Sequence, residues 1–354
     1  MPSPAERWIA SLSPWPTDGF GLDRMRALLA ALGNPQLAYP AIHVVGTNGK
    51  STATRTIEAL LATEGLDVGS TVSPHVSGWQ ERIRVRGGEA DFDEAIGRVR
   101  GEAERLEATQ FETITAAALA QFAADEVDVA VVEAGLGGRH DATNVLRTAV
   151  VLLTNVSLEH TDVLGETTEK IAAEKLAVAQ PDSVVVLPDN GYAWLVSGRR
   201  IVLGGAREAA EAFVGYAIDA EVDVTLPGRL ERRRGEIRDG AHNLDGVAWL
   251  LDRLPPADYT VCASILRDKS AAAMVARLAE TGTRFVATTS SSPRALPAIE
   301  LAALAASHFA RVESVDDPAA ALARAHELGE PVLVTGSLYL LADLAALERD
   351  GALA

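Results

Sequence analysis

Short apolar runs alternate with longer stretches of helical periodicity along most of this sequence. Residues 41–45 (AIHVV), 67–72 (DVGSTV), 127–134 (VDVAVVEA) and 148–155 (TAVVLLTN) have the length and composition of buried strands. Between and after them come helical patterns at residues 51–65, 116–126 and 167–179. This alternation predicts a parallel sheet with helices on both faces.

A second series of the same kind begins near residues 236–243 (EIRDGAHN). Between the two series lies a segment with an acidic patch, a Pro-Gly pair and a run of arginines, residues 216–235. We therefore expect two α/β domains, residues 1–225 and 226–354, with the boundary near Asp223 to Pro227.

Composition limits the class of protein. The 354 residues are 48% hydrophobic and 23% charged, which is typical of a folded globular chain. A formal net charge of −17 disfavours nonspecific binding to nucleic acid or to an anionic membrane. The single cysteine, Cys262, permits no internal disulfide, and the first residues do not resemble a secretion signal. These features predict a soluble, cytoplasmic protein.

The sequence GTNGKST, residues 46–52, follows the first apolar run and opens a helical pattern. Glycines at such a turn let backbone N–H groups converge on phosphate oxygens, and the helix N-terminus favours negative charge. Lys50 would reach the terminal phosphates of a nucleotide, and Ser51 or Thr52 would meet magnesium. A glycine-rich turn with an incidental Gly-Lys pair is the simpler alternative.

Two further polar clusters follow predicted strands. Glu133 begins EAGLGGRHDATN (133–144), and His160 lies in TNVSLEHTDVLG (154–165). The carboxyl ends of parallel strands share one sheet edge, where ligands bind. We therefore expect a magnesium–nucleotide site formed by Lys50, Glu133 and His160. The alternatives are that Glu133 only caps a turn and that His160 is structural, as most lone histidines are. Imidazole is also an unusual ligand for magnesium.

An ordered set of motifs resembles the folylpolyglutamate synthase and dihydrofolate synthase branch of the Mur ligase superfamily. The resemblance runs from about Gly19 to Leu341. Besides the three clusters above, the motifs are SPH (73–75), QERIRV (80–85), FETIT (111–115), AAEK (172–175), LPGRL (226–230), DGAHN (239–243), LRDK (266–269) and TGSLYL (335–340).

The resemblance implies a P-loop parallel-sheet ATP-binding domain followed by a smaller, Rossmann-like α/β domain. It also implies an ATP-dependent ligase that phosphorylates a carboxylate of a pteroate or folate and lets the amino group of L-glutamate attack the acyl phosphate. It places Asn48, Gly49, Lys50 and Ser51 at the ATP phosphates, and Ser73, Glu133 and His160 around magnesium, with two ions expected. Lys175 of AAEK matches the lysine that the family carries as a carbamate. An exposed helical lysine paired with Glu174 or Glu169 is the alternative without the resemblance.

By the same resemblance, Arg229 and Asp239 contact ATP and close the second domain over it, while His242 and Ser337 contact glutamate. His160 and Lys50 join Lys175 as catalytic residues, and a monomer is expected. The segments that line the pterin-bearing substrate match Gln110, Phe111, Glu112, Thr113, His140, Asp141 and Ala142. Phe111 offers a flat apolar face, although phenylalanine at helical spacing is more often a core residue.

Three departures from the family pattern bear on the acceptor. The phosphate loop reads GTNGKST where the family usually has GTNGKGS. The segment between Lys175 and Asp239 is shorter than usual and has only a compact stretch in place of a small β-rich excursion. Glu208 stands near the position of an asparagine that contacts adenine in the family, so no such contact is assigned here.

Three alternatives remain open. A Mur-type ligase could take a different carboxylate acceptor, although SPH, FETIT and GLGGRHDATN favour the folate branch. A nucleotide-binding regulatory protein without ligase activity would have had no reason to keep the whole residue set, from Lys50 to Lys175. A P-loop kinase would not need a second α/β domain with DGAHN and TGSLYL.

Overall fold

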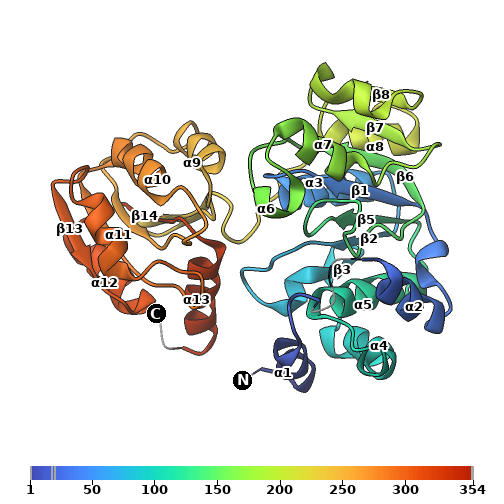
Figure 1. Cartoon of the computed structure of the whole chain (residues 1–354), viewed down its shortest axis with the longest axis horizontal. Coiled ribbons are helices and arrows are strands. Elements are labelled where there is room, and N and C mark those ends of the chain that lie inside the picture. The colour runs from blue at the N-terminus through green and yellow to red at the C-terminus, as the bar shows by residue number, and fades with distance from the viewer. Residues whose placement is uncertain (1, 17–18, 20, 352–354) are drawn as a thin grey trace. The chain divides into compact units, whose positions relative to one another are not determined.

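The computed structural model describes residues 2–16, 19 and 21–351 (Figure 1). The outer ends of the two predicted domains, residues 1 and 352–354, lie outside these described residues. The chain divides into two compact units, Met1–His75 with Trp79–Val224, and Val76–Gly78 with Thr225–Ala354. Among the described residues, no helix combines the length and apolar character needed to cross a membrane.

The first unit contains an eight-stranded sheet in the order β4-β3-β2-β5-β1-β6-β7-β8. Strands β2, β5, β1, β6, β7 and β8 are parallel, and β3 and β4 add an antiparallel edge. The strands are β1 (Ala41–Val45), β2 (Val68–Thr71), β3 (Ile83–Val85), β4 (Gly88–Glu89), β5 (Val129–Glu133), β6 (Thr148–Leu153), β7 (Val184–Leu187) and β8 (Arg200–Leu203). The parallel-sheet prediction is confirmed.

Helices cover this sheet on both faces. The helices of this unit are α1 (Pro4–Ser11), α2 (Asp23–Ala31), α3 (Lys50–Thr63), α4 (Phe92–Arg105), α5 (Gln110–Ala124), α6 (Thr161–Leu164), α7 (Thr168–Leu176) and α8 (Ala206–Val214), with 3₁₀ turns η1 (Pro35–Leu37), η2 (Trp79–Arg82) and η3 (Asn190–Val196). Successive residues of a strand point to opposite faces. In β5, Ala130 and Val132 pack with α4 and α5, whereas Val129 and Val131 pack with α3 and α8. Both faces are therefore apolar, and the strand reads as a continuous apolar run.

The short segment after α7 extends the sheet. Its two strands, β7 and β8, pair in parallel with β6 and with each other, and η3 connects them. Helix α8 follows and packs against α3. Its first turn is closed by Glu208, whose carboxylate accepts the Gly205 N–H at 2.6 Å. Glu208 therefore caps the start of its own helix.

The second unit is also α/β. Its six-stranded sheet has the order β13-β12-β11-β14-β10-β9, parallel except for β9. The strands are β9 (Glu231–Arg233), β10 (Glu236–Arg238), β11 (Thr260–Ala263), β12 (Arg284–Ala287), β13 (Arg311–Ser314) and β14 (Val332–Thr335). The helices are α9 (Leu244–Leu251), α10 (Ala271–Leu278), α11 (Ala298–Ala305), α12 (Pro318–Leu328) and α13 (Leu338–Arg349), with the 3₁₀ turn η4 (Ala279–Thr281).

Candidate active site

The phosphate loop connects the end of β1 to the start of α3. Gly46 and Gly49 have φ values of +151° and +79°, and a Cβ on Gly46 would lie 1.9 Å from Thr154 Oγ1. Both positions therefore require glycine. The Thr154 hydroxyl donates to the Asn48 carbonyl at 2.7 Å, so the residue after β6 holds the loop.

Lys50 is the first residue of α3 and is half-buried. Its ammonium donates to the Thr47 carbonyl at 3.0 Å, which folds the side chain back over the loop. Ser51 is buried in the first turn of the same helix. The N–H of Asn48 donates to Asn155 Oδ1 at 2.8 Å. Lys50 and the N-terminus of α3 thus lie together, which is an arrangement that binds phosphate in other proteins.

Four neighbouring strands end at this site. Ser73 follows β2, Glu133 ends β5, the phosphate loop follows β1, and His160 lies beyond β6, in the strand order β2-β5-β1-β6. Glu133 pairs in register with Val44, just before the loop. Its carboxylate is buried and accepts the Ser73 N–H at 3.0 Å. The structure therefore brings Ser73 and Glu133 into direct contact at the edge where Lys50 lies.

His160 is exposed and has a left-handed backbone, with φ of +50°. Its carbonyl accepts the N–H groups of Val163 and Leu164 and so begins α6. Among the described residues, no group of three or more His, Cys, Asp or Glu side chains is placed to hold a metal ion. A serine hydroxyl, a carboxylate and an imidazole would therefore hold magnesium only with further oxygens from nucleotide or water, which this ion commonly retains.

Lys175 lies in the last turn of α7 and is only 5% exposed. Its Nζ donates to the carbonyl of Gly46, the first residue of the phosphate loop, at 2.7 Å. Burial and, to a smaller extent, the positive charge of Lys50 lower the pKa of Lys175 to about 7, while the Glu159 carboxylate opposes the shift. At neutral pH a large fraction of this amine is therefore unprotonated.

The loop that follows Glu133 holds α7 in place. A Cβ on Gly138 would lie 2.5 Å from the Lys175 carbonyl oxygen and 2.7 Å from that of Glu174. The Arg139 N–H donates to the Glu174 carbonyl at 3.1 Å, and its Nε pairs with the Glu174 carboxylate at 3.2 Å. The alternative considered above was an exposed Lys175 paired with Glu174. In the structure Glu174 pairs with Arg139 instead, and Lys175 is buried.

Asp141 anchors the same loop from inside. Its buried carboxylate accepts the N–H groups of Leu136 at 2.7 Å and Thr143 at 3.0 Å. The Thr143 hydroxyl donates to Asp141 and accepts from Nε2 of His43, 2.8 Å away in β1. Burial raises the pKa of Asp141 and lowers that of His43 to about 3. Of the adjoining predicted residues, His140 is exposed and Ala142 is buried.

The FETIT segment forms the first turn of α5. Glu112 accepts the Thr109 N–H at 2.8 Å in a capping box, and the Thr113 hydroxyl donates to the Thr109 carbonyl at 2.8 Å. Gln110 Nε2 donates to the Ile9 carbonyl at 2.9 Å. Phe111 is half-buried, and its ring fills the space where a Cβ on Gly135 would lie, 2.6 Å from Cζ. Three of these four side chains thus have structural hydrogen bonds.

In the second unit, Asp239 and His242 follow β10 and Ser337 follows the adjacent parallel strand β14, whereas Arg229 lies just before β9. Asp239 is buried and accepts the N–H groups of Leu230 at 2.8 Å and Ala241 at 2.9 Å. Burial raises its pKa, and these hydrogen bonds and Arg229 oppose the rise. His242 Nδ1 lies 2.8 Å from the Gly240 carbonyl. The Ser337 hydroxyl accepts the Tyr339 N–H at 3.1 Å and begins α13.

Several residues that build the site were missed from the sequence. Gly138, Arg139 and Glu174 position α7, and His43 and Thr143 support Asp141. The spacing Thr109-x-x-Glu112 is a capping-box signature that was available in the sequence. The glycine pair in EAGLGGRH is a sequence feature that is compatible with a close backbone approach, but it does not identify α7 as the partner.

Comparison with known proteins identifies the class. The Mur ligase middle domain family matches residues 44–223. The folylpolyglutamate synthase of Lacticaseibacillus casei is 32% identical, over 90% of this chain and 92% of its own length. Escherichia coli FolC, solved with DHPP and ADP, has a TM-score of 0.85 and 26% identity and covers 99% of both chains.

A bifunctional folylpolyglutamate synthase/dihydrofolate synthase from Yersinia pestis, solved with Mn, AMPPNP and L-glutamate bound, has a TM-score of 0.83 at 26% identity and covers 98% of both chains. These matches place the protein among the Mur ligases, which are ATP-dependent. More narrowly, the chain belongs to the folylpolyglutamate synthase and dihydrofolate synthase family.

Proposed function

We propose that the protein joins L-glutamate to dihydropteroate, to the γ-carboxylate of a folate, or to both, through an acyl phosphate. The observation that carries this proposal is the buried Lys175, whose Nζ is 2.7 Å from the carbonyl of Gly46 in the phosphate loop. A phosphate-binding loop alone would fit many ATP-dependent enzymes. A lysine with a pKa of about 7 beside that loop is a much rarer combination.

In the proposed reaction, a carboxylate oxygen of the acceptor attacks the γ-phosphorus of ATP and ADP leaves. The glutamate amino group then attacks the acyl carbon, phosphate leaves, and the nitrogen loses a proton to give the amide. Lys50 and the α3 N-terminus would hold the phosphates and stabilise charge on the transferred group. Asn48, Gly49 and Ser51 would supply the remaining contacts to the phosphates.

Two magnesium ions are part of the proposal. Ser73, Glu133 and His160 would hold one of them, and the bound metal would neutralise phosphate charge during transfer. The Ser73–Glu133 contact supports this set because it already joins two of its members. We assign to Lys175 a carbamate, formed when its unprotonated amine adds CO₂ and releases a proton. The lowered pKa supports this step, because an ammonium group has no lone pair to react.

The remaining assignments are proposals for binding. Arg229 and Asp239 would contact ATP, and His242 and Ser337 would contact glutamate. For the pterin-bearing substrate, the half-buried ring of Phe111 and the exposed His140 have the accessible surfaces. Gln110, Glu112, Thr113, Asp141 and Ala142 would shape that region through the helix and loop that they hold.

The decisive experiment measures phosphate release from ATP in the presence of magnesium. We expect release that depends on both L-glutamate and dihydropteroate, with a product that is one glutamate heavier by mass spectrometry. EDTA should abolish release, and Mg²⁺ or Mn²⁺ should restore it. Activity with a muramyl peptide precursor and none with any pteroate or folate would overturn the acceptor assignment.

We also propose a monomer in the cytoplasm. Cys262 is buried and free, which fits a reducing compartment. Light scattering coupled to size exclusion tests the monomer directly, since a dimer would have twice the chain mass of 37.3 kDa.

A further inference from the structure

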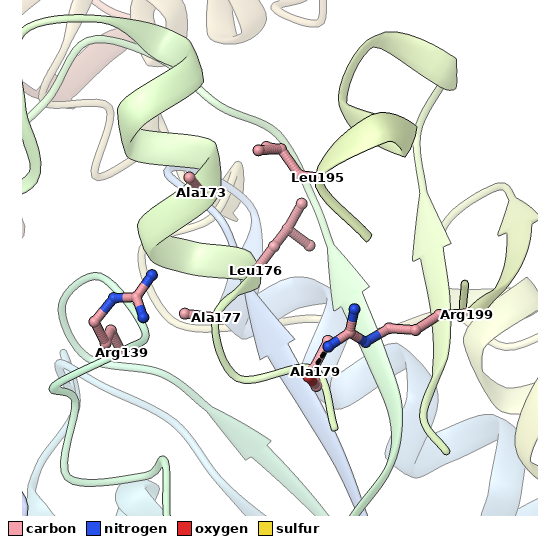
Figure 2. A pocket seen from close by; sticks show the side chains of 7 residues that line it. All are labelled: Arg139, Ala173, Leu176, Ala177, Ala179, Leu195 and Arg199. Carbon is pink, nitrogen blue, oxygen red and sulfur yellow. Dashed lines mark hydrogen bonds between the residues drawn. The ribbon is translucent and has the colours of Figure 1, made fainter. Parts of the chain in front are cut away.

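A pocket of about 380 Å³ lies on the flank of α7 (Figure 2). Its volume is near the lower end of the range for small-molecule sites, ~300–1,000 Å³. No residue assigned above to ATP, magnesium or substrate lines it. The lining residues are Arg139, Ala173, Leu176, Ala177, Ala179, Leu195 and Arg199.

The middle of this pocket is apolar and its two sides are cationic. Leu176 and Ala177 of the α7 end lie between Arg139 on one side and Arg199 on the other, and Leu195 faces them from η3 (Figure 2). No acidic residue lines the pocket, although the chain carries a formal net charge of −17. The pocket is therefore a local site of positive charge on an acidic protein.

The guanidinium group of Arg199 is held in place by backbone carbonyls. Its Nε donates to Gln180 at 3.0 Å and its Nη2 to Ala179 at 2.8 Å. These acceptors are dipoles rather than anions, so they orient the group but do not cancel its charge. An anion that entered the pocket would meet a cation whose position is already fixed, which reduces the entropy lost on binding.

Arg139 is paired, but only loosely. Its Nε lies 3.2 Å from a Glu174 carboxylate oxygen, and the side chains of the two residues are 56% and 21% exposed. An ion pair with this exposure contributes little because water competes for both partners. Its two terminal nitrogens remain able to bind a second carboxylate in the two-pronged geometry that guanidinium favours.

We propose that this pocket binds a small organic dianion: a dicarboxylate whose two charged ends are separated by a short apolar chain. One carboxylate would bind Arg139 and the other Arg199, and the methylene groups between them would cover Leu176 and Leu195. A monocarboxylate would leave one arginine without a partner. An inorganic dianion would bury no apolar surface. The proposal does not depend on the ligase function, because none of the lining residues is assigned to ATP, magnesium or substrate, although Arg139 also contacts the helix that carries Lys175.

Calorimetric titration with malonate, glutarate, adipate and suberate, at constant ionic strength and without ATP, tests the proposal. We expect saturable one-to-one binding of at least one chain length, with a Kd of about 1 mM or lower. Hexanoate, which has the same carbon count as adipate but one carboxylate, should bind at least tenfold more weakly, and so should sulfate. Absence of saturable binding across the series, or equal binding of hexanoate, would overturn the proposal.

Variants locate the site. Arg139→Gln and Arg199→Gln should each weaken binding of the best dicarboxylate about tenfold or more, because each removes a charge-assisted pair. Arg200→Gln is the matched control, since Arg200 is the exposed neighbour of Arg199 and does not line the pocket. Arg199 also holds two carbonyls, so Arg199→Lys serves as a second variant that keeps the charge and should bind more tightly than Arg199→Gln. Equal Kd values for the parent, Arg139→Gln and Arg199→Gln would place the ligand elsewhere and refute the assignment.

Discussion

Replacing Gly138 by alanine tests whether the loop after β5 sets the position of Lys175. The new Cβ would lie 2.5 Å from the Lys175 carbonyl oxygen, whereas ordinary contact begins at 3.4 Å. Either the loop or the end of α7 must therefore move by the difference, about 0.9 Å. Both obstructing atoms, the carbonyl oxygens of Glu174 and Lys175, belong to the backbone, so no side chain can rotate to make room. The φ of Gly138 is outside the left-handed region, so the clash is the only penalty.

We expect two effects of known size. Overpacking of this kind costs ~1–3 kcal/mol of the free energy of unfolding. A displacement of ~1 Å at a catalytic group lowers the rate by ~100-fold. Urea denaturation measures the loss of unfolding free energy. The loss of rate is measured as kcat/KM for ligation of glutamate to dihydropteroate, without urea and at a temperature where the variant is folded. Separate measurements are needed because lost activity could otherwise reflect unfolding alone.

Gly97→Ala is the control for this experiment. Gly97 is exposed in α4, and a Cβ there would meet nothing within 4 Å. The same substitution should stabilise the protein by ~0.5–1 kcal/mol, because alanine is the better helix former, and should leave kcat/KM unchanged. If Gly138→Ala kept full activity and parental stability, the loop would not determine the position of α7, and the explanation offered for the EAGLGGRH motif would be wrong.

Three further predictions concern Lys175 and Glu208. Lys175→Ala should lose ligation and regain part of it with small carboxylates such as acetate, and full activity without rescue would remove the lysine from the site. Because the folded-state pKa of Lys175 is about 7 and its ordinary value is 10.5, the unfolded chain binds the extra proton between these pH values. In CO₂-free buffer, the unfolding free energy of the parent relative to Lys175→Met should therefore increase with pH in that window, by up to ~1.4 kcal/mol per pH unit. If the unfolding free energies of the two proteins changed with pH in parallel, the lowered pKa of Lys175 would be contradicted. Glu208→Ala should cost ~1 kcal/mol by removing the contact with the Gly205 N–H, and should leave the KM for ATP unchanged; a raised KM would show an adenine contact.

The sequence predicted the sheet because its strands are buried on both faces and therefore appear as unbroken apolar runs. It also placed Glu133 and His160 after strands that proved to be neighbours of β1, since parallel strands all end at the same edge. Long-range packing could not be predicted in this way. Lys175 lies in a pattern typical of an exposed helix, and its hydrogen-bond partner, Gly46, is 129 positions away. Likewise, the sequence around Glu112 does not show whether this residue caps a helix or contacts a substrate, except through its spacing from Thr109.

The seclusion of Lys175 also determines which molecules can modify it. An amine with a pKa of about 7 is unprotonated to a much larger extent at neutral pH than an ordinary lysine, so it would react with aldehydes and activated esters if it were accessible. Only 5% of the residue is exposed, however, so bulky electrophiles are kept out by size. CO₂ has only three atoms, so this burial would restrict it less than it restricts those larger reagents. The same packing that makes the amine reactive thus also makes it selective.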